Sequence, residues 1–191
     1  MSPTHKPAHD PLADEWLVVR CQLGERPAFD ELIARWQLPL WRYARQLAGS
    51  DVAADDVSQE VWLRALRGIA RLRDGAKLRP WLFGIAHRVL MDRLREQFRL
   101  PLVSEGDIDL EAMPAVDDDT PDVESELAAL RDGLARLPTL ECEVLTLFYL
   151  RELSLDEVAQ VLAVPLGTVK SRLYRARRLL RRQLGLEGER G

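Results

Sequence analysis

This sequence of 191 residues has few cysteines and no long apolar run, and both absences restrict its class. Its two cysteines, Cys21 and Cys142, do not have the Cys-x-x-Cys spacing of a redox motif or a zinc site. No apolar stretch approaches the roughly 18 residues that a membrane-spanning helix requires. Residues 1–15 lack the basic and then apolar order of a secretion signal. We therefore expect a cytoplasmic protein with reduced thiols.

The sequence also lacks the sustained alternation of apolar and polar residues that marks an exposed β-strand. Apolar residues recur instead at three- and four-residue spacings, which predicts an all-α protein. In the N-terminal half, proline, glycine and serine set the expected limits of four helices. These helices are expected at about residues 10–24, 29–49 with an interruption at Pro39, 50–68 and 80–98.

The C-terminal third has the pattern of a helix-turn-helix. One apolar helix face ends at Pro138, and a short helix is expected over residues 139–150. Ser154 and Glu157 have the spacing of a capping box, which predicts the start of a helix. Pro165 then starts a last helix. Its predicted buried stripe consists of Val169, Leu173, Ala176, Leu180 and Leu184.

Charge is unevenly distributed along this chain, whose formal net charge is −4. Residues 100–130 contain ten acidic and no basic side chains, with prolines and a glycine that break helices. Residues 64–99 contain ten basic and three acidic side chains. We therefore expect two small helical domains joined by an acidic flexible linker, which is either a solvated tether or also a decoy for the basic surfaces. The expected limits are 10–99 and 123–185 for the domains and 100–122 for the linker.

A helix-turn-helix places its second helix in the DNA major groove, where early residues read base edges and flanking basic residues hold phosphates. The run VKSRLYRARRLLRR, residues 169–182, lies on that second helix and has seven basic and no acidic side chains. Lys170, Ser171 and Arg172 fall in its first turns. The pattern favours a DNA-binding helix over the alternative, an arginine-rich helix that is merely solvated.

Three motifs occur in an order and at separations typical of one family. They are DDVSQEVWLRAL at 55–66, RPWLFGIAHRVLMDRLRE at 79–96 and LPTLECEVLTLFYLRELSLDEVAQVLAVPLGTVKSRLYRARRLL at 137–180. Over roughly residues 25–184 the chain resembles the extracytoplasmic function (ECF) subfamily of the sigma-70 family of RNA polymerase sigma factors. Residues 167–173 match the typical ending of region four residue by residue. The resemblance implies an alternative sigma factor that directs promoter-specific transcription initiation.

The same resemblance implies the partners: core RNA polymerase, promoter DNA and an anti-sigma factor. It implies no catalytic activity, cofactor, metal or small-molecule substrate, and no stable homo-oligomer is expected. Two rival functions are a stand-alone repressor or activator and a nucleic-acid enzyme. The first would need a dimerisation surface and no polymerase dock. The second would need a nucleophile, a metal cluster or a phosphate-binding glycine-rich loop, none of which the sequence shows.

The resemblance assigns the first motif to docking on the polymerase clamp helices. Polar side chains on one side of that helix form the expected polymerase-binding surface: Asp55, Asp56, Gln59 and Glu60. Paired carboxylates also suit a metal or acid–base site, but no His or Cys lies nearby. The alternative is a solvated helix face.

The second motif combines aromatic rings with basic side chains, which suits contact with unpaired bases. The resemblance assigns it to the minus-10 element. The expected contacts are Trp81, Phe83, His87, Arg88, Arg93 and Arg95. Trp81 and Phe83 could instead be core residues. Family members often carry Asn at the position of Arg88, so the preferred minus-10 sequence stays open.

The third motif is assigned to the minus-35 element. Its expected contacts are Thr168, Lys170, Ser171, Arg172, Tyr174, Arg175 and Arg178. Arg172, near the helix start, is a candidate base reader, and Arg178 is a candidate phosphate contact.

Overall fold

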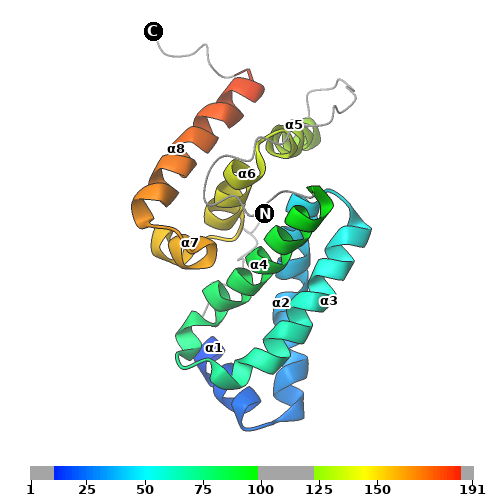
Figure 1. The fold of residues 1–191 in the computed structure, drawn as a ribbon, viewed down its shortest axis with the longest axis vertical. Coiled ribbons are helices and arrows are strands. Elements are labelled where there is room, and N and C mark those ends of the chain that lie inside the picture. Colours follow the sequence, from blue (N-terminus) through cyan, green and yellow to red (C-terminus); the bar gives the residue numbers. More distant parts are fainter. Residues whose placement is uncertain (1–10, 99–122, 186–191) are drawn as a thin grey trace.

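The computed structural model describes residues 11–98 and 123–185, and every regular element in these stretches is helical (Figure 1). The predicted all-α fold is therefore confirmed. The N-terminal helices are α1 (Pro11–Gln22), α2 (Arg26–Ala48), α3 (Asp51–Gly68) and α4 (Leu78–Phe98). The C-terminal helices are α5 (Val123–Ala135), α6 (Thr139–Leu145), α7 (Leu155–Leu162) and α8 (Leu166–Gln183). The linker predicted at residues 100–122 lies outside the described residues.

Local sequence signals place the ends of several helices. Gly49 ends α2 in the left-handed conformation, with φ of 75°, and the Ser50 hydroxyl accepts the Ala53 N–H at 3.2 Å to begin α3. The capping box predicted for α7 is present. Ser154 Oγ accepts the Glu157 N–H at 3.2 Å, and the Glu157 carboxylate accepts the Ser154 N–H at 2.7 Å. These bonds satisfy amides that have no partner within the helix.

The predicted interruption at Pro39 is wrong, because α2 runs from Arg26 to Ala48 without a break. An internal proline removes one helical hydrogen bond and costs about 3 kcal/mol. Here the helix buries a long apolar face whose packing offsets that cost. The buried side chains on this face are Ala28, Leu32, Trp36, Leu40, Tyr43 and Ala44.

The helix predicted over residues 139–150 is divided in two. The α-helical part, α6, ends at Leu145, and Thr146–Leu150 continue as a π-helical turn. Arg151 closes this turn by donating its N–H to the Thr146 carbonyl at 2.9 Å. A π-turn holds one more residue than an α-turn, so it shifts the direction of the side chains that follow. Leu147 is therefore buried, while Tyr149 and Leu150 are exposed.

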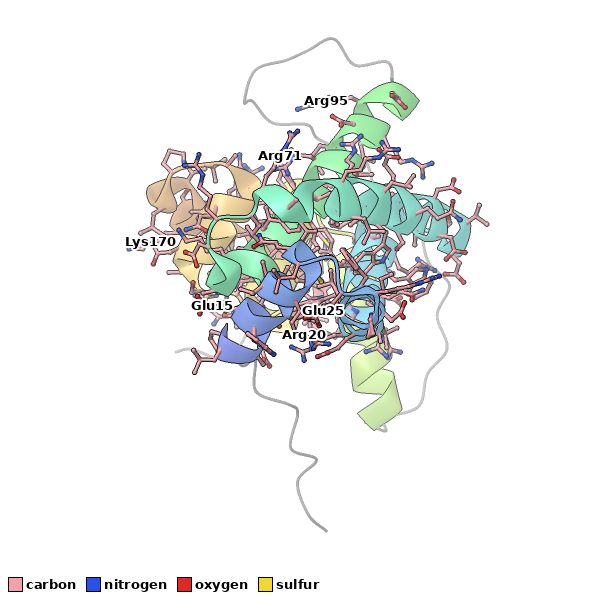
Figure 2. The ribbon with its side chains drawn as sticks, turned by 90° about the horizontal axis from the view of Figure 1, so that it is seen from below. Glu15, Arg20, Glu25, Arg71, Arg95 and Lys170 are labelled. Carbon is pink, nitrogen blue, oxygen red and sulfur yellow. The ribbon has the colours of Figure 1, made fainter. Side chains whose placement is uncertain are left out.

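The four N-terminal helices pack around one apolar core. Helix α1 lies across the turn that joins α3 to α4, where the Gln22 amide donates to the carbonyls of Ile69 and Leu72 at 3.0 and 2.8 Å. At Gly75 in this turn, an added Cβ would stand 2.8 Å from the Glu15 Cα, so only glycine permits the approach. Arg20, visible beside Glu25 in Figure 2, pairs with that residue at 2.9 Å.

The C-terminal helices form a smaller core in which α8 packs against α5, α6 and α7. Its buried side chains include Leu147, Leu153 and Val158, together with Val169 and Leu173 of α8. This packing fixes α7 and α8 as a helix-turn-helix.

The two sets of helices are in contact. Helix α4 packs along α7, and α2 meets α6, so the buried apolar side chains of both domains form one continuous cluster (Figure 1). At Gly84 of α4 the two backbones approach each other, because an added Cβ would lie 4.0 Å from the Val161 Cα of α7. None of the helices within residues 11–98 and 123–185 is long and apolar enough to cross a membrane.

Candidate nucleic-acid interface

Helix α8 presents one buried face and one basic face. It begins at Leu166 after a turn in which Ala163 takes the left-handed conformation, with φ of 53°. Val169, Leu173 and Ala176 are buried, as the apolar stripe predicts, whereas Leu180 and Leu184 are only partly buried. The basic side chains fall between the stripe positions, so the fold holds them on the outside of the domain.

The predicted minus-35 residues differ in what they contact. Lys170, Tyr174 and Arg178 are exposed, and Figure 2 shows Lys170 directed away from the protein. Thr168 and Arg172 are partly buried, and the hydroxyl of exposed Ser171 donates to the Thr168 carbonyl at 3.0 Å. Within its own helix, Ser171 therefore already has one hydrogen bond.

Two basic residues of α8 are bound to neighbouring elements. Arg175 lies 3.2 Å from the carboxylate of Glu141 in α6. The guanidinium of Arg177 stands 5.3 Å from the ring centre of Tyr149 and 6.0 Å from that of Phe148, which are cation–π distances. Both contacts join α8 to the segment from α6 through the π-turn, and the sequence pattern did not indicate either of them.

The predicted polymerase-binding residues lie on the outer side of α3, with Glu60 partly buried and the other three exposed. Three of them have partners. Asp55 accepts the indole N–H of Trp41 at 2.7 Å, and Asp56 pairs with Arg93 of α4 at 3.0 Å. Glu60 pairs with Arg64 at 2.6 Å. The acidic surface is therefore partly neutralised.

An apolar groove beside this acidic surface was missed by the sequence reasoning. It runs between α2 and α3 and its lining includes Ile33, Trp41, Trp62, Leu63 and Leu66. Leu63 is 49% exposed and Leu66 is 38% exposed, although both are large apolar residues. The signal was present in the sequence, because both fall outside the buried face of α3. An apolar groove whose lining also includes the Asp55 carboxylate is suited to binding a protein helix.

The predicted minus-10 residues on α4 are placed very differently from one another. Phe83 is 1% exposed, and its ring meets those of Tyr43 and Trp36 edge to face at 5.4 and 6.4 Å. Trp81 is partly buried and packs on Gly68, where an added Cβ would stand 3.1 Å from its ring. Phe83 thus takes the core role that the sequence analysis left open as an alternative.

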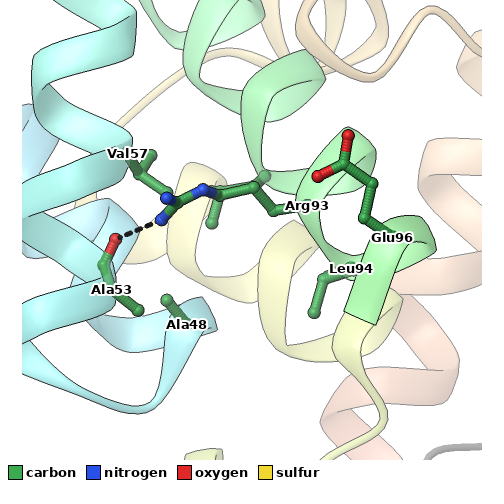
Figure 3. Close-up of a pocket in the computed structure, with 7 residues that line it drawn as sticks. Ala48, Ala53, Val57, Arg93, Leu94 and Glu96 are labelled. Carbon is green, nitrogen blue, oxygen red and sulfur yellow. Dashed lines mark hydrogen bonds between the residues drawn. The ribbon is translucent and has the colours of Figure 1, made fainter. Parts of the chain in front are cut away.

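The basic residues of α4 also divide into two groups. Arg88 and Arg95 are exposed. Arg93 reaches across to α3, where it donates to the Ala53 carbonyl at 3.2 Å (Figure 3). It also pairs with Asp56. Arg88 and Arg95 are therefore the more accessible cations on this helix, and Arg93 holds α3 and α4 together.

The sixth predicted minus-10 residue, His87, contacts the C-terminal domain. Its Nδ1 lies 2.7 Å from Oε1 of Glu143 in α6, and the same oxygen accepts the Tyr43 hydroxyl of α2. Because a carboxylate only accepts hydrogen bonds, Nδ1 of His87 is the donor in this contact. Burial raises the pKa of Tyr43 well above its ordinary value, and the Glu143 carboxylate raises it further.

Two more side chains at this contact, Cys142 and Arg151, have shifted pKa values. Burial raises the pKa of the Cys142 thiol from 9.0 to about 11. The pKa of Arg151 is lowered to about 10, chiefly by burial and in smaller part by repulsion from Arg42 of α2. Across residues 11–98 and 123–185, no group of three or more His, Cys, Asp or Glu side chains could hold a metal ion.

Comparison with known families agrees with this geometry. Residues 32–99 match sigma-70 region 2, and residues 127–180 match sigma-70, region 4. SigM of Mycobacterium tuberculosis, an ECF RNA polymerase sigma factor, is 35% identical over 173 residues, covering 91% of this chain and 85% of SigM. BldN of Streptomyces coelicolor is 33% identical over 170 residues, covering 88% of this chain, which spans 64% of the length of BldN.

Solved structures show the same fold. CnrH, in complex with the cytosolic domain of CnrY, superposes with a TM-score of 0.67 at 26% identity, covering 92% of this chain and 99% of CnrH. RpoE of Bartonella quintana, in complex with the anti-sigma factor NepR, has a TM-score of 0.64 at 21% identity, covering 83% and 98%. The chain belongs to the ECF subfamily of the sigma-70 family. It is a transcription initiation factor and not an enzyme.

Proposed function

We propose that this chain, acting in the cytoplasm, brings core RNA polymerase to promoters through two domains with separate tasks. The N-terminal domain, residues 10–99, docks on the polymerase and opens the minus-10 element. The C-terminal domain, residues 123–185, reads the minus-35 element, and residues 100–122 connect the two. The observation that carries this proposal is the exposed basic face of α8. The opposite face of α8 is a buried apolar stripe, which holds the helix in a helix-turn-helix with the capped helix α7.

Docking on the polymerase uses the acidic surface of α3 together with the apolar groove between α2 and α3. The groove supplies apolar area through Trp62, Leu63 and Leu66. Asp55 and Gln59 form part of its edge, and Asp56 and Glu60 lie beside them on α3. Together these four side chains set the orientation of a basic partner helix. Apolar contacts contribute most of the affinity of such an interface, and charged groups at the rim favour the correct partner.

Recognition of the minus-10 element uses the exposed side of α4. Arg88 and Arg95 are exposed and suited to phosphates or unpaired bases, and the partly buried ring of Trp81 offers a stacking surface. Phe83 and Arg93 support these residues from within the domain in the observed conformation. His87 contributes once it is released from Glu143.

Recognition of the minus-35 element uses Thr168, Lys170, Ser171, Arg172, Tyr174, Arg175 and Arg178. The early residues face the base edges and the later arginines hold phosphates. Control by an anti-sigma factor is supported by the structures of CnrH with CnrY and of the B. quintana RpoE with NepR, whose folds this chain shares.

One reconstitution tests the proposed function. The purified chain is added to core RNA polymerase with fragmented genomic DNA, and transcript starts are mapped. We expect starts that need the chain and share upstream elements near positions −35 and −10. As a control, the Arg172→Ala variant should lose selectivity among these starts without losing polymerase binding. Binding of DNA by the chain alone, with no association with core polymerase, would establish the stand-alone regulator instead.

A further inference from the structure

The first half of α4 is covered by the C-terminal domain. Gly84 is buried against Val161 of α7, and the side chain of His87 is 15% exposed because it faces Glu143 of α6. Arg88, one residue further along, is exposed. The surface of α4 assigned above to the minus-10 element is thus accessible at one end and closed at the other.

The contact depends on a buried carboxylate. Glu143 is 0% exposed, and its Oε1 receives hydrogen bonds from two residues of the other domain, Tyr43 and His87. Its Oε2 has no hydrogen-bond partner among the described residues. A buried carboxylate is strongly unfavourable unless it is hydrogen-bonded, so Glu143 is satisfied only while the two domains are together or after water has replaced both partners.

A second feature works against the contact. Arg151, beside the π-turn, is partly buried at the same boundary and is close enough to Arg42 of α2 for repulsion to act on its ionisation. The Nε of Arg151 has no hydrogen-bond partner among the described residues. Separation of the domains would hydrate Arg151 and relieve the repulsion. The boundary between the domains therefore combines stabilising hydrogen bonds to Glu143 with destabilising repulsion between Arg42 and Arg151. Such a balance is expected for a contact that can open.

We propose that Tyr43, His87 and Glu143 form a latch that holds the chain in a closed, autoinhibited state. In this state the minus-10 surface of α4 is partly covered, whereas the basic face of α8 stays accessible. Promoter opening requires the latch to break, because His87 and Gly84 cannot face both the C-terminal domain and DNA. This inference rests on the proposed function of α4 and α8, but the latch itself is a property of the free chain.

A disulfide across the boundary provides the direct test. A Cβ added at Gly84 would lie 4.0 Å from the Val161 Cα, so a disulfide between Gly84→Cys and Val161→Cys should lock the closed state. The background carries Cys21→Ala and Cys142→Ala to remove the native thiols. The full-length chain is assayed with core polymerase, oxidised and then reduced, and each single cysteine variant is the control.

We expect the oxidised double variant to initiate transcription at least about tenfold less than its reduced form, while binding of minus-35 duplex changes less than about twofold. The single variants should not respond to reductant. Equal initiation by the oxidised and reduced forms would overturn the proposal. Failure of the folded pair to form a disulfide would also overturn it, since the closed state would then not be populated.

The thiol of Cys142 gives an independent measurement that needs no polymerase. Cys142 is 4% exposed and lies beside Gln46 of α2, whose amide is 3.8 Å from its sulfur. Tyr43→Phe keeps the ring but leaves the buried carboxylate with one partner fewer. We expect it to raise the reaction rate of Cys142 with a thiol reagent about tenfold, because the closed state loses a bond to a charged group.

Cys21, which is buried within the N-terminal domain, is the internal reference and should keep its rate. Tyr149→Phe removes a hydroxyl from an exposed tyrosine and is the matched control. An unchanged rate for Cys142 in Tyr43→Phe would refute the latch. If the parent chain failed to initiate transcription at all, the proposed function would fail, and this thiol measurement would still decide whether the latch exists.

Discussion

Arg175 of α8 lies 3.2 Å from the carboxylate of Glu141 in α6, and that glutamate is only 5% exposed. An exposed arginine next to a buried acid differs from the other basic residues of the helix. Removing it leaves a carboxylate with little access to water, so the loss affects the fold as well as any DNA contact. Arg175 therefore has a structural role that the basic run by itself does not reveal.

We expect Arg175→Ala to lower the free energy of unfolding by about 1–3 kcal/mol, because Glu141 loses a charged partner. Arg178→Ala is the matched control, since Arg178 is exposed on the same helix and should change the free energy of unfolding by less than about 0.5 kcal/mol. Urea denaturation of both variants measures the difference. Equal stability would show that the ion pair with Glu141 does not stabilise the domain.

The Arg172→Ala and Arg178→Ala variants should differ in how their DNA binding is weakened. Arg172→Ala should cost about 1–3 kcal/mol at the preferred sequence and relax preference at one position of the minus-35 element, because a base contact is lost. Arg178→Ala should weaken binding to all sequences alike and reduce the salt slope by about one. Binding to a promoter library at several salt concentrations separates the two. If both variants keep the parental affinity, preference and salt slope, α8 does not read DNA.

Docking should depend on both the groove and its acidic edge. Leu66→Glu places a charge in the groove, and Asp56→Arg with Glu60→Arg reverses the edge, so each should weaken association with core polymerase by about tenfold or more. Asp132→Arg, an exposed charge reversal on α5, is the control and should bind normally. Co-sedimentation measures association. Normal binding by folded groove and edge variants would locate the dock elsewhere.

Promoter opening should distinguish two arginines of α4. Arg88→Ala should reduce melting more than closed-complex formation, because the expected partners of Arg88 are unpaired bases. Arg93→Ala removes the contacts to Asp56 and Ala53 and should chiefly lower the thermal stability. Permanganate footprinting, compared with filter binding, reports the two steps. An equal loss of both steps in a stable Arg88→Ala variant would contradict a specific role in melting.

The buried thiol of Cys142 should make stability depend on alkaline pH. Its pKa is about 11 in the folded chain against 9.0 for an ordinary thiol, chiefly because of burial. The folded state thus retains a proton that the unfolded state releases. This stabilisation, about 2–3 kcal/mol, is fully present below pH 9.0 and is lost as the pH rises through about 11.

The measurement compares the parent with Cys142→Ala in urea at pH 8 and at pH 11, which cancels the titration of other groups. The difference in the free energy of unfolding between the parent and Cys142→Ala should be smaller at pH 11 than at pH 8 by about 2 kcal/mol. A difference between the two proteins that does not change with pH would mean that Cys142 titrates normally.

The sequence by itself determined the all-α fold, the helix-turn-helix and the family. Helix periodicity, the Ser154–Glu157 capping box and the stripe through Val169 and Leu173 depend on residues within one or two turns of each other. Such short-range geometry can be read directly from spacing. For the same reason, the sequence placed the basic side chains of α8 on the outside of its buried stripe.

Only the tertiary structure decided which candidate side chains are accessible. The continuity of α2 through Pro39 follows from burial against other helices, which outweighs the local cost of proline. Phe83 has the local pattern of either a core or a stacking residue. The tertiary structure shows that it is a core residue, because its ring packs against those of Trp36 and Tyr43. Accessibility depends on neighbours that are distant along the chain.

The same limit applies to the contact between the domains. Tyr43 and Glu143 are separated by 100 positions, and no spacing rule connects them. Glu143 appears in the sequence as one more acid on a short helix. Its role arises because packing removes it from water and presents two residues of the other domain to the same oxygen. Burial and partner geometry are properties of the assembled chain, so the structure alone identifies this group.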